Sequence, residues 1–101
     1  MFEIDFNDAG QVAVAGRLDA SQAVKAQEFL DGVVADQCVI DMAALEYISS
    51  AGLGVLLRTH KRLMADGQGL RLVNVNSHIH DIFSYSGFDR LFTVEPLEAS
   101  D

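Results

Sequence analysis

Hydrophobic and polar positions alternate near the start of the chain, as they do in a strand with one buried face. Phe2, Ile4 and Phe6 are separated by acidic residues, and residues 12–18 repeat the alternation. Between the two stretches, residues 7–10 are of types that favour turns. The pattern therefore predicts a β-hairpin at the N-terminus.

After the hairpin, short apolar runs typical of buried strands alternate with stretches whose apolar residues recur at helical spacing. Such alternation is typical of a mostly parallel sheet with right-handed crossovers. We therefore predict a single α/β domain over residues 1–101, with element order ββαβαβαβ and a mixed sheet of about five strands covered by helices. The expected later strands are 37–42, 70–73 and 91–94, and the expected helices are 21–34, one from Ser49 or Ser50 to Gly67, and 77–85.

Two local features of this prediction depend on individual side chains. Asp19 or Ser21 is expected to cap the first helix, because both side chains accept hydrogen bonds from free backbone N–H groups. The segment between the strand at 37–42 and the next helix is expected to be a loop. Its apolar members are Leu45, Tyr47 and Ile48.

Composition and charge narrow the classes of function. The 101 residues are 50% hydrophobic and 22% charged, which is a globular balance. Seven basic residues against fifteen acidic ones give a net charge of −8, which disfavours binding to nucleic acid or anionic membranes and favours a basic protein partner. No apolar run approaches the roughly 18 residues of a membrane span, and Cys38 is the single cysteine. We therefore expect a cytoplasmic protein, as a monomer or weak dimer.

A cluster of small residues stands where the second helix is expected to begin. Residues 41–57 read DMAALEYISSAGLGVLL, so a strand leads to Ser49 and Ser50 at a helix start. A serine there is accessible to another protein, and a phosphate on it can accept hydrogen bonds from helix amides. Ala51 and Gly52 keep the approach open. The alternative is that these serines only cap the helix.

Three motifs resemble those of STAS domains, the anti-sigma factor antagonist family. ISSAGLG at 48–54 is similar to the family pattern D-S-[ST]-[AG]-G-L-G at the start of the second helix. GRLD at 16–19 looks like the end of the family's second strand, and SYSGF at 84–88 resembles a later turn. The resemblance implies a STAS fold. It also implies a helix after the last strand, for which residues 97–101 are too short, so we expect a short C-terminal tail.

The resemblance implies a function in partner switching. The unphosphorylated protein would bind an anti-sigma factor that is also a serine kinase of the GHKL type, phosphorylation would break the complex, and a serine phosphatase would restore it. Alignment on 52–54 makes Ser50 the acceptor, with Ser49, which stands where many members have Asp, as its rival. The residues expected to contact the partner are Asp19, Tyr47, Ser49, Ala51 and Gly52.

Two other functions remain open from the sequence. A STAS subunit of a transporter or stressosome-like complex would bind its partners without phosphorylation. A small enzyme would use Ser50 as a nucleophile with His60, His78 or His80 as base, but S-S-A-G lacks the G-x-S-x-G pattern of hydrolases. No further cysteine or carboxylate pattern joins His78 and His80 into a metal site. We therefore predict a protein that is not an enzyme and needs no cofactor or metal.

Overall fold

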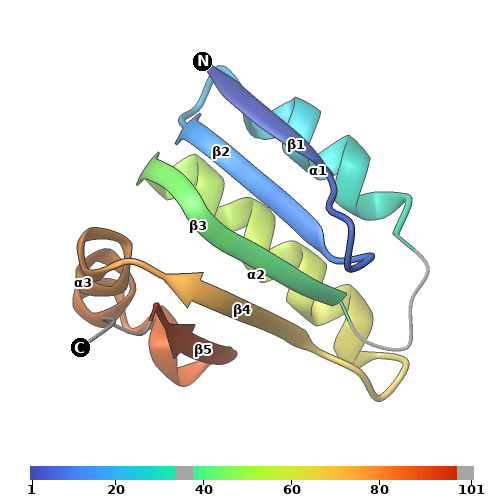
Figure 1. Ribbon diagram of the computed structural model, residues 1–101. Helices are drawn as coiled ribbons and strands as arrows, with labels where there is room; N and C mark the ends of the chain where they lie inside the picture. The colour runs from blue at the N-terminus through green and yellow to red at the C-terminus, as the bar shows by residue number, and fades with distance from the viewer. Residues whose placement is uncertain (34–37, 98–101) are drawn as a thin grey trace.

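The computed structural model describes residues 1–33 and 38–97, and its elements follow the predicted order ββαβαβαβ (Figure 1). A hairpin of β1 and β2 precedes three helices that alternate with three further strands. The bounds are β1 Phe2–Phe6, β2 Val12–Leu18, α1 Ala23–Asp31, β3 Cys38–Ile48, α2 Ser50–Met64, β4 Leu70–Val75, α3 Ser77–Ser86, the 3-10 helix η1 Phe88–Arg90 and β5 Thr93–Pro96.

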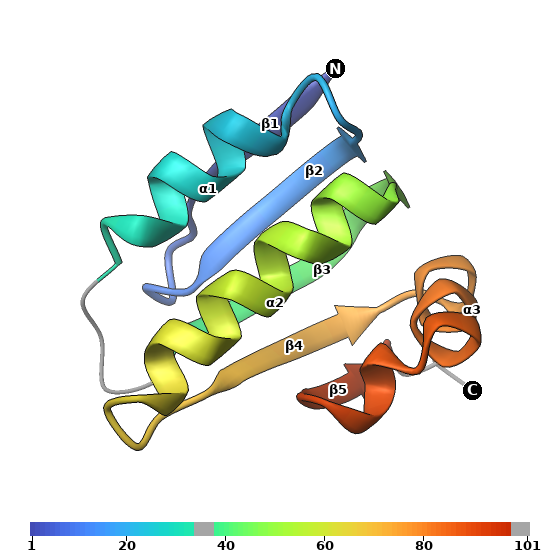
Figure 2. The ribbon, with the colours of Figure 1, turned by 180° about the vertical axis from the view of Figure 1, so that it is seen from behind.

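The five strands form one mixed, mostly parallel sheet in the order β1-β2-β3-β4-β5, as predicted. Only the β1–β2 pair is antiparallel. Opposite views show α1 and α2 together on one face of this sheet, and α3 beside the ends of β3 and β4 (Figures 1 and 2). Within the described residues no helix lies over the other face, so the expected helical cover is one-sided. We call this other face the open face.

The hydrophobic core lies between the sheet and its two covering helices. Along α2, the buried positions 52, 53, 55, 56, 59 and 63 follow helical spacing, which places them on one side of the helix. The strands present every second residue to them. Completely buried apolar side chains of the strands are Ile40, Met42, Leu45 and Leu72.

Two polar side chains in this layer are inert for structural reasons. The buried Thr59 donates its hydroxyl to the carbonyl of Val55 at 2.9 Å, which satisfies it. Cys38 is also buried, and desolvation raises the pKa of its thiol. Neither group is therefore available for chemistry.

The expected loop around Tyr47 is wrong, because β3 continues to Ile48. The second half of the strand pairs with β2, where Ala15 lies opposite Ala44 and Leu18 opposite Ile48. Two register shifts interrupt this pairing. Extra residues at the shifts destroy the alternating pattern, which is why the sequence suggested a loop. Gln37, the expected first residue of this strand, lies outside the described residues.

The boundaries of the first helix also differ from the prediction. α1 begins at Ala23, and its N-cap is Gln22, whose side chain makes no capping hydrogen bond. Asp19 instead accepts hydrogen bonds from the backbone and hydroxyl of Ser21, and the N–H of Gln22 donates to the Asp19 carbonyl. Asp19 thus stabilises a turn before the helix. The helix ends at Asp31 rather than at residue 34, which is not described.

The last strand lies two residues later than predicted, at Thr93–Pro96. The 3-10 helix Phe88–Arg90 precedes it, and the hydrophobic pattern did not predict this element. Phe92 is buried against the rings of Phe83 and Phe88, so its apolar character reflects core packing ahead of the strand. Pro96 ends the edge strand, where the lack of an N–H donor is tolerated.

Candidate functional site

The start of α2 is held against the end of β2. The N–H of Ser49 donates to the Leu18 carbonyl at 2.9 Å. A Cβ added to Gly52 would lie 2.8 Å from Leu18 Cγ and 2.7 Å from Ile48 Cγ1. Since such distances are too short for carbon atoms, the helix approaches the strand this closely only because residue 52 is glycine.

The two serines at this point have different environments. Ser49 is the N-cap and half-buried, and its Oγ accepts a hydrogen bond from the Gly52 N–H at 3.3 Å. Ser50 is the first residue of the helix and is exposed. Among the described residues its hydroxyl has no hydrogen-bond partner. The capping role therefore belongs to Ser49, and the hydroxyl of Ser50 faces solvent at the positive end of the helix dipole.

The other predicted contact residues surround this helix start. Ala51 is half-buried in the first turn, which carries no acidic side chain. Asp19 directly follows Leu18, and its pKa is lowered, chiefly by the hydroxyl of Ser21 that donates to it. The structure thus brings these residues and the two serines together at the ends of β2 and β3.

Tyr47 lies at the same ends but on the open face of the sheet. It pairs with Arg17 across β2 and β3, whereas the next pair, Leu18 and Ile48, is buried on the helical face. The Arg17 guanidinium stands 4.4 Å from the centroid of the Tyr47 ring, which is a cation–π contact. The sequence contained Arg17 only within the GRLD motif. Its contact with Tyr47 depends on the strand register, which the sequence pattern did not reveal.

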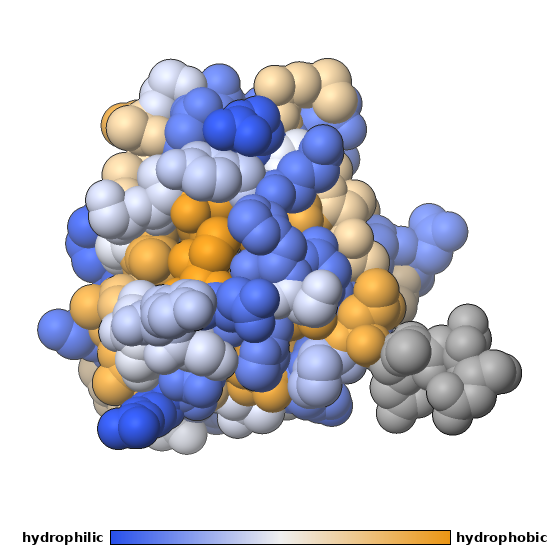
Figure 3. Space-filling model, turned by 90° about the vertical axis from the view of Figure 1, so that its left-hand side faces the viewer, coloured by the Kyte–Doolittle hydropathy of each residue, from blue (hydrophilic) through white to orange (hydrophobic). Residues whose placement is uncertain are grey.

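Figure 3 shows the side of the molecule at which β2, β3 and β4 end. An apolar and hollowed patch is visible there within a rim of polar residues. An exposed apolar patch of this kind is typical of a surface that meets another molecule.

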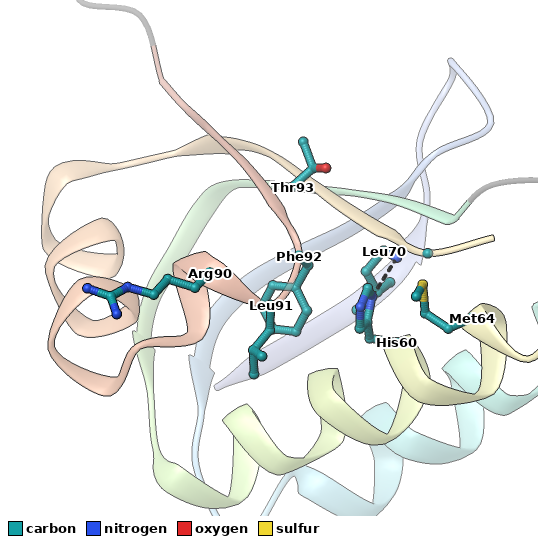
Figure 4. A pocket seen from close by; sticks show the side chains of 8 residues that line it. His60, Met64, Leu70, Arg90, Leu91, Phe92 and Thr93 are labelled. Carbon is teal, nitrogen blue, oxygen red and sulfur yellow. Dashed lines mark hydrogen bonds between the residues drawn. The ribbon is translucent and has the colours of Figure 1, made fainter. Parts of the chain in front are cut away.

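A separate depression lies beside the second half of α2 (Figure 4). It has a volume of about 490 Å³, with His60 and Phe92 in its lining. His60 accepts a hydrogen bond at Nδ1 from the Leu70 N–H and packs edge-on against Phe92, so it is a structural histidine. No serine, cysteine or carboxylate is among the described residues that line the depression. It therefore offers no set of catalytic groups.

None of the three histidines is hydrogen-bonded to Ser50 among the described residues. His60 lies ten residues further along α2, about 15 Å away by helical rise. No hydrogen bond within the described residues joins Ser50 to His78 or His80 in α3. Over residues 1–33 and 38–97 no group of three or more His, Cys, Asp or Glu side chains is suited to a metal ion. None of the described helices is long and apolar enough to span a membrane.

Comparison with known families identifies the fold. The family described as "Mlab, STAS domain" matches residues 2–95. The chain belongs to the STAS domain family. This confirms the resemblance found in the motifs.

Related proteins place this STAS domain near the anti-sigma factor antagonists. It is 41% identical over 56 residues to BtrV of Bordetella bronchiseptica, a curated protein whose name describes it as an anti-sigma factor antagonist. The match covers 55% of this chain and 48% of BtrV, so the chain spans about half the length of this relative.

Solved structures share the fold of this chain. The anti-sigma factor antagonist from Mycobacterium paratuberculosis has a TM-score of 0.80 at 25% identity, over 95% of this chain and 85% of that one. The antagonist SpoIIAA in its unphosphorylated form, a Bacillus protein, has a TM-score of 0.69 at 18% identity, over 97% and 90% of the two chains. These relatives are named as antagonists, not as enzymes, in agreement with the prediction of a non-enzymatic protein.

Proposed function

We propose that this STAS domain, a single domain over residues 1–101, is an anti-sigma factor antagonist that switches partners by reversible phosphorylation of Ser50. The observation that carries the proposal is the division of roles between two serines. Ser49 caps α2, and the hydroxyl of Ser50 is exposed without a hydrogen bond among the described residues. SpoIIAA, a structural relative, has been solved in unphosphorylated and phosphorylated forms, which supports a switch of this kind.

The proposed partner is an anti-sigma factor that is also a GHKL-type serine kinase. In the complex, the Ser50 oxygen attacks the γ-phosphorus of the kinase's ATP, ADP leaves with the bridging oxygen, and the hydroxyl proton passes to a base of the kinase. A serine phosphatase reverses the change by hydrolysis. All of these steps take place in the cytoplasm, with the antagonist as a monomer or weak dimer.

Electrostatics is sufficient to separate the partners after phosphorylation. A phosphate adds about −1.5 to −2 charges to a chain that already carries −8. One unit charge of the partner about 6 Å away, with the same sign, would oppose it by about 3 kcal/mol at an effective dielectric constant of 20. That energy corresponds to about a hundredfold loss of affinity. No large conformational change is needed.

The proposed contact surface consists of the residues around the helix start. Ala51 is small and half-buried beside the acceptor, and Tyr47 supplies an aromatic side chain on the open face. Gly52 is buried and its hydrogen faces Leu18 and Ile48, so it acts by letting α2 lie against β2 and not by opening the surface to a partner. The hollowed apolar patch on the same side supports docking there (Figure 3). The proposed contact residues are Asp19, Tyr47, Ser49, Ala51 and Gly52.

The test is phosphorylation by the cognate kinase with ATP, followed by intact-mass measurement and peptide mapping. Ser50 is expected to carry the single phosphate, and Ser50→Ala should bind the kinase but remain unmodified. Ser49→Ala is the matched control and should still be phosphorylated. Ser50→Asp should bind the kinase more weakly. A phosphate on Ser49, or on neither serine, would contradict the assignment.

A second candidate function is a STAS subunit of a transporter or stressosome-like complex that acts without phosphorylation. The serine at position 49, in place of the family's usual Asp, favours this alternative. A pull-down that recovers transporter subunits, with equal yield from Ser50→Asp and the unmodified protein, would decide for this alternative.

A further inference from the structure

The two covering helices leave part of the helical face of the sheet open. Five strands spaced about 4.8 Å apart make a face about 24 Å wide. Two helices packed side by side cover about 20 Å of it, because each occupies about 10 Å. Figure 2 shows α1 and α2 side by side, and among the described residues only the short η1 lies over the face between α2 and β5. The sheet therefore has room for a further helix beside α2.

The depression of about 490 Å³ lies in this place (Figure 4). Its lining includes the buried side chains of Leu70, on β4, and Phe92. Met64 of α2 and Leu91, directly after η1, stand on either side of them and are 56% and 47% exposed. We call the depression between these four residues the α2–η1 groove. Large apolar side chains exposed around a hollow are typical of a surface that meets another molecule.

The basic side chains of the chain differ in whether they are already engaged. Two of the seven, Lys61 and Arg90, make no hydrogen bond, ion pair or cation–π contact within residues 1–33 and 38–97. The five that make such a contact are Arg17, Lys25, Arg58, Arg62 and Arg71.

Both unengaged cations stand beside the α2–η1 groove. Arg90 lines it, and its guanidinium extends away from the other lining side chains into the surroundings (Figure 4). Lys61 is exposed on α2 three residues before Met64, which makes the two side chains neighbours on the helix surface. The groove is thus flanked by a free positive charge on each of its two helical sides.

The acidic groups near the groove do not neutralise these two charges. Asp89 accepts a hydrogen bond from the Ser84 hydroxyl of α3, and Glu95 is paired with Arg71. No carboxylate is among the described residues that line the groove. In a chain with a net charge of −8, this place therefore differs from the rest of the surface, and it is complementary to an acidic partner.

We propose that the α2–η1 groove docks an amphipathic helix of a partner protein, with acidic residues on both sides of its apolar stripe. The stripe lies against Met64 and Leu91, and the acidic residues face Lys61 and Arg90. A helix is the occupant that matches the geometry, because the groove continues the row of α1 and α2 on the same face and helices pack at about 8–10 Å. An apolar stripe between charged flanks is the recognition pattern of such helices.

Docking at this groove is independent of the state of Ser50. Lys61 lies eleven residues after Ser50 on α2, which is about 16 Å by helical rise. This distance is twice the Debye length of about 8 Å at physiological salt. A partner helix in the groove therefore stays bound while the helix start is modified. The inference goes beyond the proposed function and does not rest on it.

The test uses the full chain and two synthetic helical peptides of about 14 residues, each stapled by a lactam bridge and labelled with fluorescein. The first carries leucines at helical spacing with glutamates on both flanks. The second keeps the leucines and has lysine in place of every glutamate. Fluorescence anisotropy measures the affinity of each peptide. The acidic peptide should bind more tightly, and added salt should weaken its binding.

Substitutions of exposed side chains locate the contacts without disturbing the core. Lys61→Gln and Arg90→Gln should each weaken binding of the acidic peptide by about two- to fivefold, the range of exposed ion pairs. Arg17→Gln changes the net charge equally on the open face and should have no effect. Met64→Ser should weaken binding by about fivefold. Val24→Ser, at an apolar position of α1 that is 68% exposed, is its matched control and should bind like the parent.

Nitrogen-15 NMR shows where the acidic peptide binds. The amide signals of Met64, Leu91 and Thr93 should shift, and that of Ser50 should not. Equal affinity for the two peptides, shifts confined to other parts of the chain, or no binding at about 1 mM peptide would overturn the inference. A dimer in sedimentation velocity that Met64→Ser abolishes would assign the groove to a second copy and overturn it as well. Failure of a kinase to modify Ser50 would count against the proposed function alone.

Discussion

Replacement of Gly52 by alanine tests how the helix start is built. The new Cβ would lie 2.7 Å from Ile48 Cγ1, 2.8 Å from Leu18 Cγ and 2.9 Å from the Leu18 carbonyl oxygen. The last of these atoms belongs to the backbone and also accepts the Ser49 N–H. It cannot retreat by a side-chain rotation. The first turn of α2 must therefore move away from β2.

The size of the effect follows from two opposing terms. Overpacking of a close contact costs about 1–3 kcal/mol. Alanine is favoured over glycine within a helix by about 1 kcal/mol, and this offsets part of that cost. We expect Gly52→Ala to lower the free energy of unfolding by up to about 2 kcal/mol. The same displacement would weaken the Ser49 hydrogen bond to Leu18.

Gly54→Ala is the matched control, two residues further along the helix. Its Cβ would meet only the terminal atoms of Arg58, with the nearest at 3.2 Å, and that flexible side chain can move aside. We expect a change between zero and a gain of about 1 kcal/mol. The assay is urea denaturation followed by far-UV circular dichroism, since the chain has no tryptophan. Equal stability of Gly52→Ala and Gly54→Ala would refute the argument.

Three further predictions concern other contacts. Ser49→Ala should lower the free energy of unfolding by about 1 kcal/mol, because it removes the N-cap, and denaturant unfolding measures this loss. Arg62→Ala should cost about 1–3 kcal/mol in the same assay, because the guanidinium donates to the Leu30 carbonyl at the end of α1. Arg71 donates to the carboxylate of Glu95 and lowers its pKa. The Arg71–Glu95 pair therefore stabilises the folded protein fully above the ordinary pKa of a glutamate, and this stabilisation is lost as pH falls through the lowered pKa of Glu95. Glu95→Gln should accordingly make Tm depend less on pH in the acid range.

The strands and helices that could be predicted from the sequence are those in which apolar residues recur at a constant spacing. Phe2, Ile4 and Phe6 alternate without interruption, and the buried positions of α2 recur at helical spacing. The second half of β3 could not be predicted in this way. Two register shifts against β2 place extra residues in the strand, so Leu45 and Ile48 are both buried although three positions apart. A pattern of strict period two fails at such bulges.

The candidate site was predictable where it depends on neighbours along the chain. Ser49, Ser50 and Gly52 form a local motif, and the expected helix start is where the structure has it. The Arg17–Tyr47 contact joins residues thirty positions apart through the register of two parallel strands.

The predicted cap of α1 was wrong because several nearby donors compete for the carboxylate of Asp19. An aspartate before a helix can bond several nearby donors, and the sequence does not say which one it takes.

The tandem serines divide two roles at the start of α2, and Ser49 takes the capping role that the usual Asp would also fill. The first turn of a helix has free backbone N–H groups, and a side-chain acceptor can satisfy one of them. Here Ser49 Oγ accepts a hydrogen bond from the Gly52 N–H. If the same hydroxyl were also the phosphate acceptor, modification would change the cap and the stability of the helix together. With the cap on Ser49, a phosphate on Ser50 adds charge at the positive end of α2 and leaves the capping hydrogen bond in place. Binding can then be switched while the fold that presents the switch remains intact.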